Sequence, residues 1–319
     1  MPAVDMSLSE LRRYAGRNPR PDDFDDYWER ALNELANTEP DLELQPAEFE
    51  CEAAECFHLT FTGVRGARIH AKYLRPKHAA PRHPAVLEFH GYSGNSGEWA
   101  TKLAWVSEGV SVFSMDCRGQ GGLSQDVGGV RGTTLRGHIV RGLDDDPDNL
   151  LFRQIFLDTA RLAALAMEMP EVDPDRVGAT GGSQGGGLTL ACGALMPAVK
   201  RLAPVFPFLT DYQRVWEMDL GRNAYEELGE FFRRFDPTHD REDELFRRLG
   251  YIDVQNLAPR IKGEVLMATG LRDEICPAST QFAAYNKITA KKQIEIYPDF
   301  GHENLPGHTD KIFQFMRGL

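Results

Sequence analysis

The sequence predicts an α/β protein whose mostly parallel central sheet carries helices on both faces. From residue 85 onward, short apolar runs alternate with stretches of helical periodicity, which is the pattern of parallel strands joined by crossover helices. One such junction, a strand, a glycine-rich turn and a helix in direct succession, falls at residues 177–195. The runs expected to form the sheet are 85–89, 110–115, 177–180, 202–206, 265–269 and 294–297.

The N-terminal part adds a helix and an antiparallel edge to this sheet over residues 21–75. Residues 21–35 have acidic residues in their first turn and apolar residues at helical spacing, which predicts an amphipathic helix. Two β-rich stretches, 57–61 and 67–73, flank the sequence Gly63-Val64-Arg65-Gly66, which is typical of a hairpin.

The alternation of predicted strands and helices is interrupted at residues 211–251. This interval is charged, rich in aromatic residues and helical in pattern, so it is expected to be a helical insertion between two strands of the core. Such an insertion either covers an active site or forms a contact between subunits. The residues by themselves do not choose between these two roles.

The composition favours one ordinary globular domain over residues 1–319. Of these residues 42% are hydrophobic and 26% are charged, and the formal net charge is -12. A strongly acidic chain repels the phosphates of nucleic acids and anionic membrane surfaces, so partners of both kinds are disfavoured. The sequence has no signal-peptide pattern and no apolar run long enough to cross a bilayer, which predicts a cytoplasmic location.

The candidate nucleophile is Ser183, within Gly181-Gly182-Ser183-Gln184-Gly185. This G-x-S-x-G segment follows a predicted strand and precedes a predicted helix, the context in which such a serine is held out at a strained turn. Glycines two positions to either side are needed because strand and helix pack too closely there for a side chain.

A serine hydroxyl becomes a useful nucleophile only with a neighbouring base and an acid that orients the base. Asp273 follows the predicted strand 265–269, and His302 follows the predicted strand 294–297. The chain order Ser, Asp, His is that of the α/β-hydrolase fold, so we predict this fold and this catalytic triad. Taken alone, His302 would be interpreted as a surface loop histidine and Asp273 as a turn residue near a helix start, and it is their combination after two successive strands that favours the triad.

The tetrahedral intermediate of acyl transfer carries a negatively charged oxygen that requires two N–H donors. One is expected from Gln184, the residue after the nucleophile. The other is expected from the loop that follows strand 85–89, where the chain reads His90-Gly91-Tyr92-Ser93-Gly94, and we predict that it is the backbone N–H of Tyr92.

Three motifs then give the chain a specific resemblance: Arg118-Gly119-Gln120, the turn around Ser183, and His302-Glu303. On these motifs the chain resembles carbohydrate esterase family seven, the acetyl xylan esterases and cephalosporin C deacetylases. The resemblance implies a serine carboxylesterase that deacetylates small acetyl esters, including acetylated xylo-oligosaccharides and the acetoxymethyl group of cephalosporin C. It also implies a homohexamer, in which the insertion at 211–251 would form a subunit interface.

Arg118, Gln120 and Glu303 are expected to support the triad. Because the motif that contains Arg118 follows the strand 110–115, its side chains are expected at the catalytic rim, where Arg118 would pair with Glu303 and hold the loop of His302. The proposed chemistry requires no metal and no organic cofactor.

Two other functions remain open at the level of the sequence. Because a fold does not fix a function, the same framework would serve a peptidase or a carbon–carbon hydrolase. A ligand-binding relative that has lost turnover is the third reading, which the complete Ser-Asp-His set disfavours.

Overall fold

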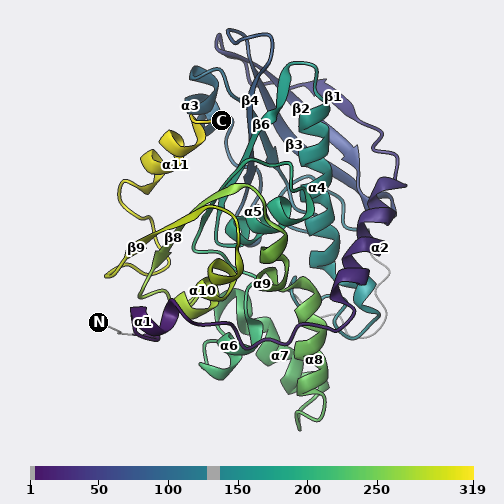
Figure 1. Ribbon diagram of the computed structural model, residues 1–319. Helices are drawn as coiled ribbons and strands as arrows, with labels where there is room; N and C mark the ends of the chain where they lie inside the picture. Colours follow the sequence, from purple (N-terminus) through teal and green to yellow (C-terminus); the bar gives the residue numbers. More distant parts are fainter. Residues whose placement is uncertain (1–3, 128–136) are drawn as a thin grey trace.

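A computed structural model of the chain describes residues 4–127 and 137–319. Its centre is a sheet of nine strands in the order β1-β2-β3-β5-β4-β6-β7-β8-β9 (Figure 1). The strands are β1 (Glu43–Pro46), β2 (Ala54–Thr62), β3 (Arg68–Pro76), β4 (His83–Phe89), β5 (Ser111–Met115), β6 (Val172–Gly182), β7 (Arg201–Val205), β8 (Glu264–Gly270) and β9 (Lys292–Tyr297). The six strands from β4 to β9 correspond to the six predicted runs.

The pairing of the strands changes from antiparallel to parallel at β5. Strands β5, β4, β6, β7, β8 and β9 are parallel, whereas the pairs β1–β2, β2–β3 and β3–β5 are antiparallel. The turn between β2 and β3 contains Arg65 and Gly66 with φ angles of 61° and 78°, a left-handed conformation that glycine adopts without strain. The predicted α/β-hydrolase fold, mostly parallel with an antiparallel edge, is the observed fold.

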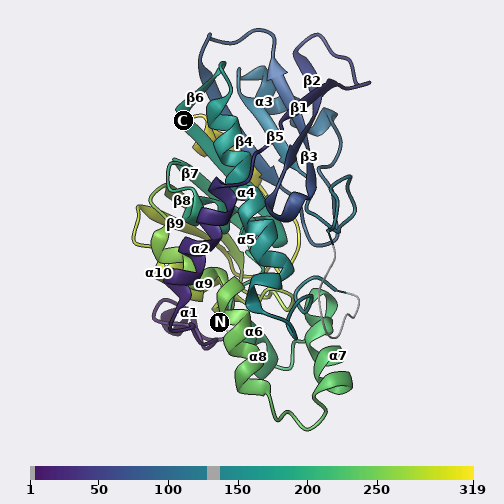
Figure 2. The ribbon, with the colours of Figure 1, turned by 90° about the vertical axis from the view of Figure 1, so that its right-hand side faces the viewer.

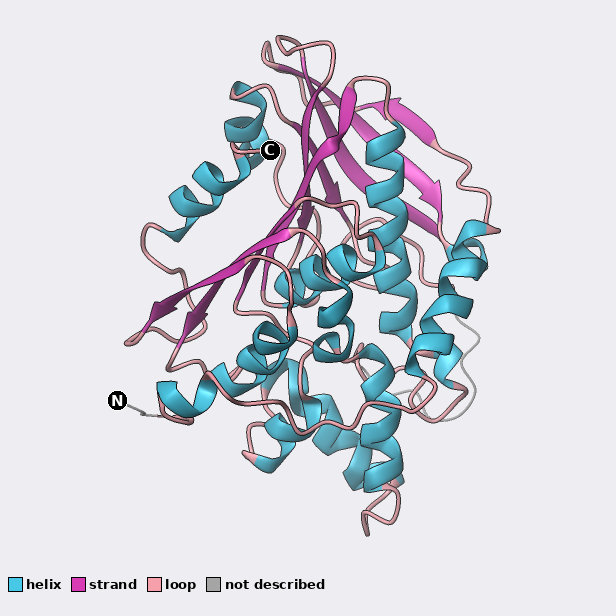
Figure 3. Ribbon diagram, viewed as in Figure 1, coloured by secondary structure: helices cyan, strands magenta, loops and turns pink. Residues whose placement is uncertain are grey.

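Helices cover both faces of the sheet (Figure 3). On one face α4 and α5 lie against β6, and on the other α3 contacts β3 and β5 while α11 contacts β7 and β8. The helices are α1 (Leu8–Leu11), α2 (Phe24–Ala36), α3 (Leu103–Ser107), α4 (Leu151–Glu168), α5 (Gln184–Leu195), α6 (Tyr212–Glu217), α7 (Glu226–Phe235), α8 (Glu242–Leu249), α9 (Val254–Leu257), α10 (Ala278–Lys287) and α11 (His308–Met316).

Strand β4 shows why the core of its sequence, residues 85–87, is apolar. Ala85 and Leu87 pack in the large core beneath α4 and α5, whereas Val86 packs in the smaller core beneath α3 and α11. Successive side chains of a strand point to opposite faces, so a strand covered on both sides has no exposed position.

Helices α6, α7 and α8 form a separate group at the end of the molecule opposite α3 (Figures 1 and 2). They lie between β7 and β8 in the chain, where the sequence predicted helical material. Helix α7 carries acidic residues in its first turn and Arg233 and Arg234 in its last, an arrangement that complements the helix dipole. Among the described residues, none of the helices combines the length and apolar character needed to cross a membrane.

Candidate active site

Ser183 occupies the sharp turn between β6 and α5. Its backbone has φ 57° and ψ -120°, which is rare for a residue with a side chain and stores strain at this position. The neighbouring glycines explain how the turn is accommodated, because a Cβ on Gly181 or Gly185 would lie 2.5 Å or 2.0 Å from the carbonyl oxygen of Phe89. The predicted close packing of strand and helix is therefore present.

The structure brings Ser183, His302 and Asp273 into one hydrogen-bonded chain. The Nε2 atom of His302 lies 3.0 Å from Ser183 Oγ, and its Nδ1 atom lies 2.8 Å from Asp273 Oδ2. An ionised carboxylate only accepts hydrogen bonds, so Nδ1 carries the proton and Nε2 is left to accept the proton of the serine. These residues come from three strand ends that meet at one edge of the parallel sheet.

Asp273 is fixed in its orientation by its own backbone neighbours. Its side chain is fully buried, and its Oδ1 atom accepts hydrogen bonds from the amides of Ile275 (2.9 Å) and Cys276 (2.8 Å). These donors satisfy one carboxylate oxygen and leave Oδ2 directed at the imidazole. The carboxylate can therefore hold the histidine in one tautomer and stabilise its protonated form.

The two predicted oxyanion donors lie on segments that are linked by Gln120. Gln184 is the first residue of α5, a position whose backbone N–H has no acceptor within the helix. Its side-chain amide pairs with that of Gln120 through two hydrogen bonds of 2.9 and 3.0 Å. Gln120 Oε1 also accepts from the amide of Ser93, 2.8 Å away, next to Tyr92. Gln120 thus connects both donor segments.

The predicted pair between Arg118 and Glu303 is wrong. The Arg118 guanidinium points away from the catalytic rim, into the core, and makes a bidentate pair with Asp158 of α4 at 2.6 and 2.7 Å. It also donates to Gln154 Oε1. Glu303 is exposed, and its Oε1 atom accepts from the amide of Gly301. Adjacent residues of a loop can face opposite directions, and a motif does not reveal which of them turns inward.

Asp273 and His302, together with the neighbouring Cys276, carry donor atoms of the kind that bind metal ions. Donor atoms of Asp273, Cys276 and His302 lie within 4.8 Å of one another. The donor set suits a triad better than a metal, because burial raises the pKa of the Cys276 thiol well above its ordinary range and a metal requires the thiolate. Both nitrogens of His302 are also engaged already.

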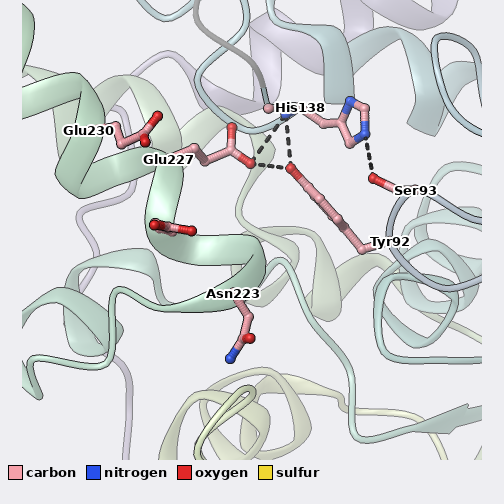
Figure 4. A pocket seen from close by; sticks show the side chains of 8 residues that line it. Tyr92, Ser93, His138, Asn223, Glu227 and Glu230 are labelled. Carbon is pink, nitrogen blue, oxygen red and sulfur yellow. Dashed lines mark hydrogen bonds between the residues drawn. The ribbon is translucent and has the colours of Figure 1, made fainter.

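A pocket of about 410 Å³ lies beside the oxyanion segment (Figure 4). It lies between the loop after β4 and helix α7. Among the residues that line it, Figure 4 labels Tyr92, Ser93, His138, Asn223, Glu227 and Glu230. Sequence reasoning missed His138 and Glu227. The sequence His138-Ile139 lies in a stretch that resembles the family. Its contact with Glu227 of α7, however, joins residues that are 89 positions apart, and no short sequence pattern predicts such a contact.

Comparisons with known proteins show the family of the chain. A family model described as acetyl xylan esterase (AXE1) matches residues 1–319. The crystal structure of acetyl xylan esterase 1 from Thermoanaerobacterium sp. JW/SL YS485 is 60% identical, with a TM-score of 0.97 over 98% of this chain and 99% of that one. The acetyl xylan esterase from Paenibacillus sp. R4 is 35% identical, with a TM-score of 0.93 over the same shares.

A more distant relative is longer than this chain. The acetyl esterase Axe7A from Xylanibacter ruminicola is 27% identical over 295 residues, which make up 91% of this chain. The match covers 64% of Axe7A.

Proposed function

Because the chain belongs to the acetyl xylan esterase family and is a carboxylic ester hydrolase, we propose that it deacetylates small acetyl esters through an acetyl-enzyme on Ser183. The observation that carries the proposal is the continuous hydrogen-bonded chain from Ser183 through His302 to Asp273. Such a chain activates a hydroxyl for attack on a carbonyl carbon.

The proposed reaction has two halves. Ser183 Oγ attacks the acetyl carbonyl while His302 Nε2 takes the hydroxyl proton, and His302 then gives this proton to the departing alcohol oxygen. Water attacks the acetyl-enzyme in the second half, with His302 again accepting a proton and returning it to Ser183. The products are acetate and the free alcohol, and Asp273 stabilises the imidazolium in both halves.

The proposed oxyanion hole consists of the backbone N–H groups of Tyr92 and Gln184. Their segments are joined by Gln120, so the two donors are preorganised relative to one another. Removing one such donor costs on the order of 10²–10³ in kcat.

The substrate class, assembly and location are proposed from the resemblance and the family. We propose acetylated xylo-oligosaccharides and the acetoxy group of cephalosporin C as substrates, a homohexamer as the assembly, and the cytoplasm as the location. The loop of Tyr92 lines a pocket of about 410 Å³, a volume within the range of small-molecule sites.

The test compares acetate, butyrate and peptide substrates for the wild-type protein and Ser183→Ala. We expect turnover of acetate esters in preference to butyrate, and its loss in Ser183→Ala. Cleavage of peptides by the wild type would replace the proposal with peptidase chemistry. Absence of even a stoichiometric burst of product from an activated acetate ester would indicate a binding protein without turnover.

A further inference from the structure

Glu227 of α7 places a buried carboxylate against the oxyanion segment. The residue is 5% exposed, and it belongs to the helical group α6–α8 rather than to the hydrolase core. Its Oε1 atom accepts hydrogen bonds from the Tyr92 hydroxyl and from the amide of His138 at 3.2 Å (Figure 4). Its Oε2 atom accepts from the amide of Val140 at 2.9 Å.

The backbone of residues 137–140 is shaped around this carboxylate. Gly137 has a φ of 123°, which residues with a side chain rarely adopt, and a Cβ at this position would lie 2.3 Å from Glu227 Oε2. Burial raises the pKa of Glu227 to about 6, and the hydrogen bonds from Tyr92 and the backbone amides act in the opposite direction. The donors therefore stabilise a charge that burial would otherwise disfavour.

The same contacts fix the Tyr92 side chain. Its hydroxyl donates to Glu227 and accepts from the amide of His138 at 3.1 Å. Its ring packs against the His138 ring, with 4.7 Å between centroids, and edge-on against Phe208 at 5.7 Å. The next residue, Ser93, has its hydroxyl 3.1 Å from His138 Nε2.

We propose that Glu227 is a positioning residue that sets the backbone N–H of Tyr92 in the oxyanion hole by anchoring the tyrosine hydroxyl. The oxyanion segment is then held from two sides, by Gln120 at the amide of Ser93 and by Glu227 at the far end of the Tyr92 side chain. Through Glu227, near its N-terminus, helix α7 thereby supplies a residue that positions this segment. This inference depends on the proposed function, because it assigns a role within the same site.

The test uses Glu227→Gln, Tyr92→Phe and the double variant, assayed with an aryl acetate and with an acetylated xylo-oligosaccharide. Tyr92→Phe removes the hydroxyl that donates to Glu227 and leaves helix α7 untouched, whereas Glu227→Gln replaces one of the two acceptor oxygens with an amide group that can only donate. We expect kcat to fall about 10-fold in each, because small displacements of a catalytic group cost up to about 10²-fold. The value of KM should change little, and the double variant should be no slower than the slower single variant.

The loss should be equal for both esters, because the oxyanion hole acts on the acetyl carbonyl that they share. A loss confined to the sugar ester would instead indicate a role in binding the alcohol and would overturn the inference. So would multiplicative losses in the double variant, or an unchanged kcat in both single variants.

Asp236→Asn is a matched control. Asp236 lies at the end of α7, is 5% exposed, and accepts hydrogen bonds from the amides of Asp240 and Arg241 at 3.0 and 2.9 Å. Its substitution should lower the thermal unfolding midpoint without changing kcat. Ser183→Ala separates the two levels of proposal. If it stays active, the proposed function fails; if it is inactive while Glu227→Gln and Tyr92→Phe are both fully active, only the role of Glu227 is refuted.

Discussion

Replacing Arg118 with Met is expected to destabilise the fold rather than to impair catalysis. The side chains of Arg118 and Asp158 are 1% and 0% exposed and share two short hydrogen bonds. Arg118→Met would leave the Asp158 carboxylate buried without a counter-charge, and Gln154 Oε1 would lose a donor. Removing one partner of a buried ion pair costs about 3–5 kcal/mol of unfolding free energy, a large fraction of the stability of a typical domain.

The measurement is urea-induced unfolding, together with kcat at a urea concentration where every variant is folded. We expect a loss of about 3–5 kcal/mol in Arg118→Met, and recovery to within about 2 kcal/mol of wild type in Arg118→Met/Asp158→Leu, because apolar side chains can replace a buried pair. Arg317→Met is the control, because the surface pair of Arg317 with Glu108 has side chains that are 51% and 37% exposed and should contribute less than about 1 kcal/mol.

Two outcomes would refute this reasoning. If Arg118→Met lost less than about 1 kcal/mol, the pair would not be the buried, desolvated contact described above. If kcat fell on the order of 100-fold while unfolding was unchanged, Arg118 would act on the reaction itself, as in the pairing with Glu303 that the structure contradicts.

Three further predictions concern Gln120, two glycines and the buried Asp116. Gln120→Ala removes the amide bridge between the two oxyanion segments and should lower kcat about 10-fold with little change in KM, measured by steady-state kinetics. Gly185→Ala should abolish activity or folding, because the added Cβ would lie 2.0 Å from a carbonyl oxygen. Gly229→Ala, within α7, should instead raise stability by up to about 1 kcal/mol, because its Cβ would lie 3.9 Å from the nearest atom, Cζ3 of Trp216. Asp116→Asn should lower the thermal unfolding midpoint at pH 7. Burial opposes the charge of Asp116, but hydrogen bonds from His70 and two amides hold its pKa well below the ordinary value of 3.8. Its stabilisation is therefore present above about pH 4 and is lost as the pH falls further, so the difference between variant and wild type should shrink in acid.

The predictions that succeeded rest on local rules. A strand covered on both faces is mostly apolar, and the turn that exposes Ser183 must have glycines where a Cβ would meet the carbonyl of Phe89. The order of Ser183, Asp273 and His302, each after a predicted strand, then indicated which edge of the sheet they share. Their proximity followed from topology, because parallel strands end at the same edge.

The predictions that failed or were missing concern the direction of individual side chains and contacts between distant segments. Arg118 and Gln120 are two residues apart in one motif, yet the first points into the core toward α4 and the second pairs with Gln184 and with the amide of Ser93. Nothing in the motif distinguishes these directions, because they depend on the φ and ψ angles of the loop and on which acceptors lie on either side.

The sequence by itself determined the parallel sheet, the turn at Ser183 and the three residues that hydrogen bonds join there, because periodicity, glycine positions and chain order are properties of short segments. Only the tertiary structure decided that Arg118 pairs with Asp158 and that Glu227 contacts Tyr92. The reason is physical: a buried charge must find a partner within a few ångströms in space, and that partner can lie anywhere along the chain.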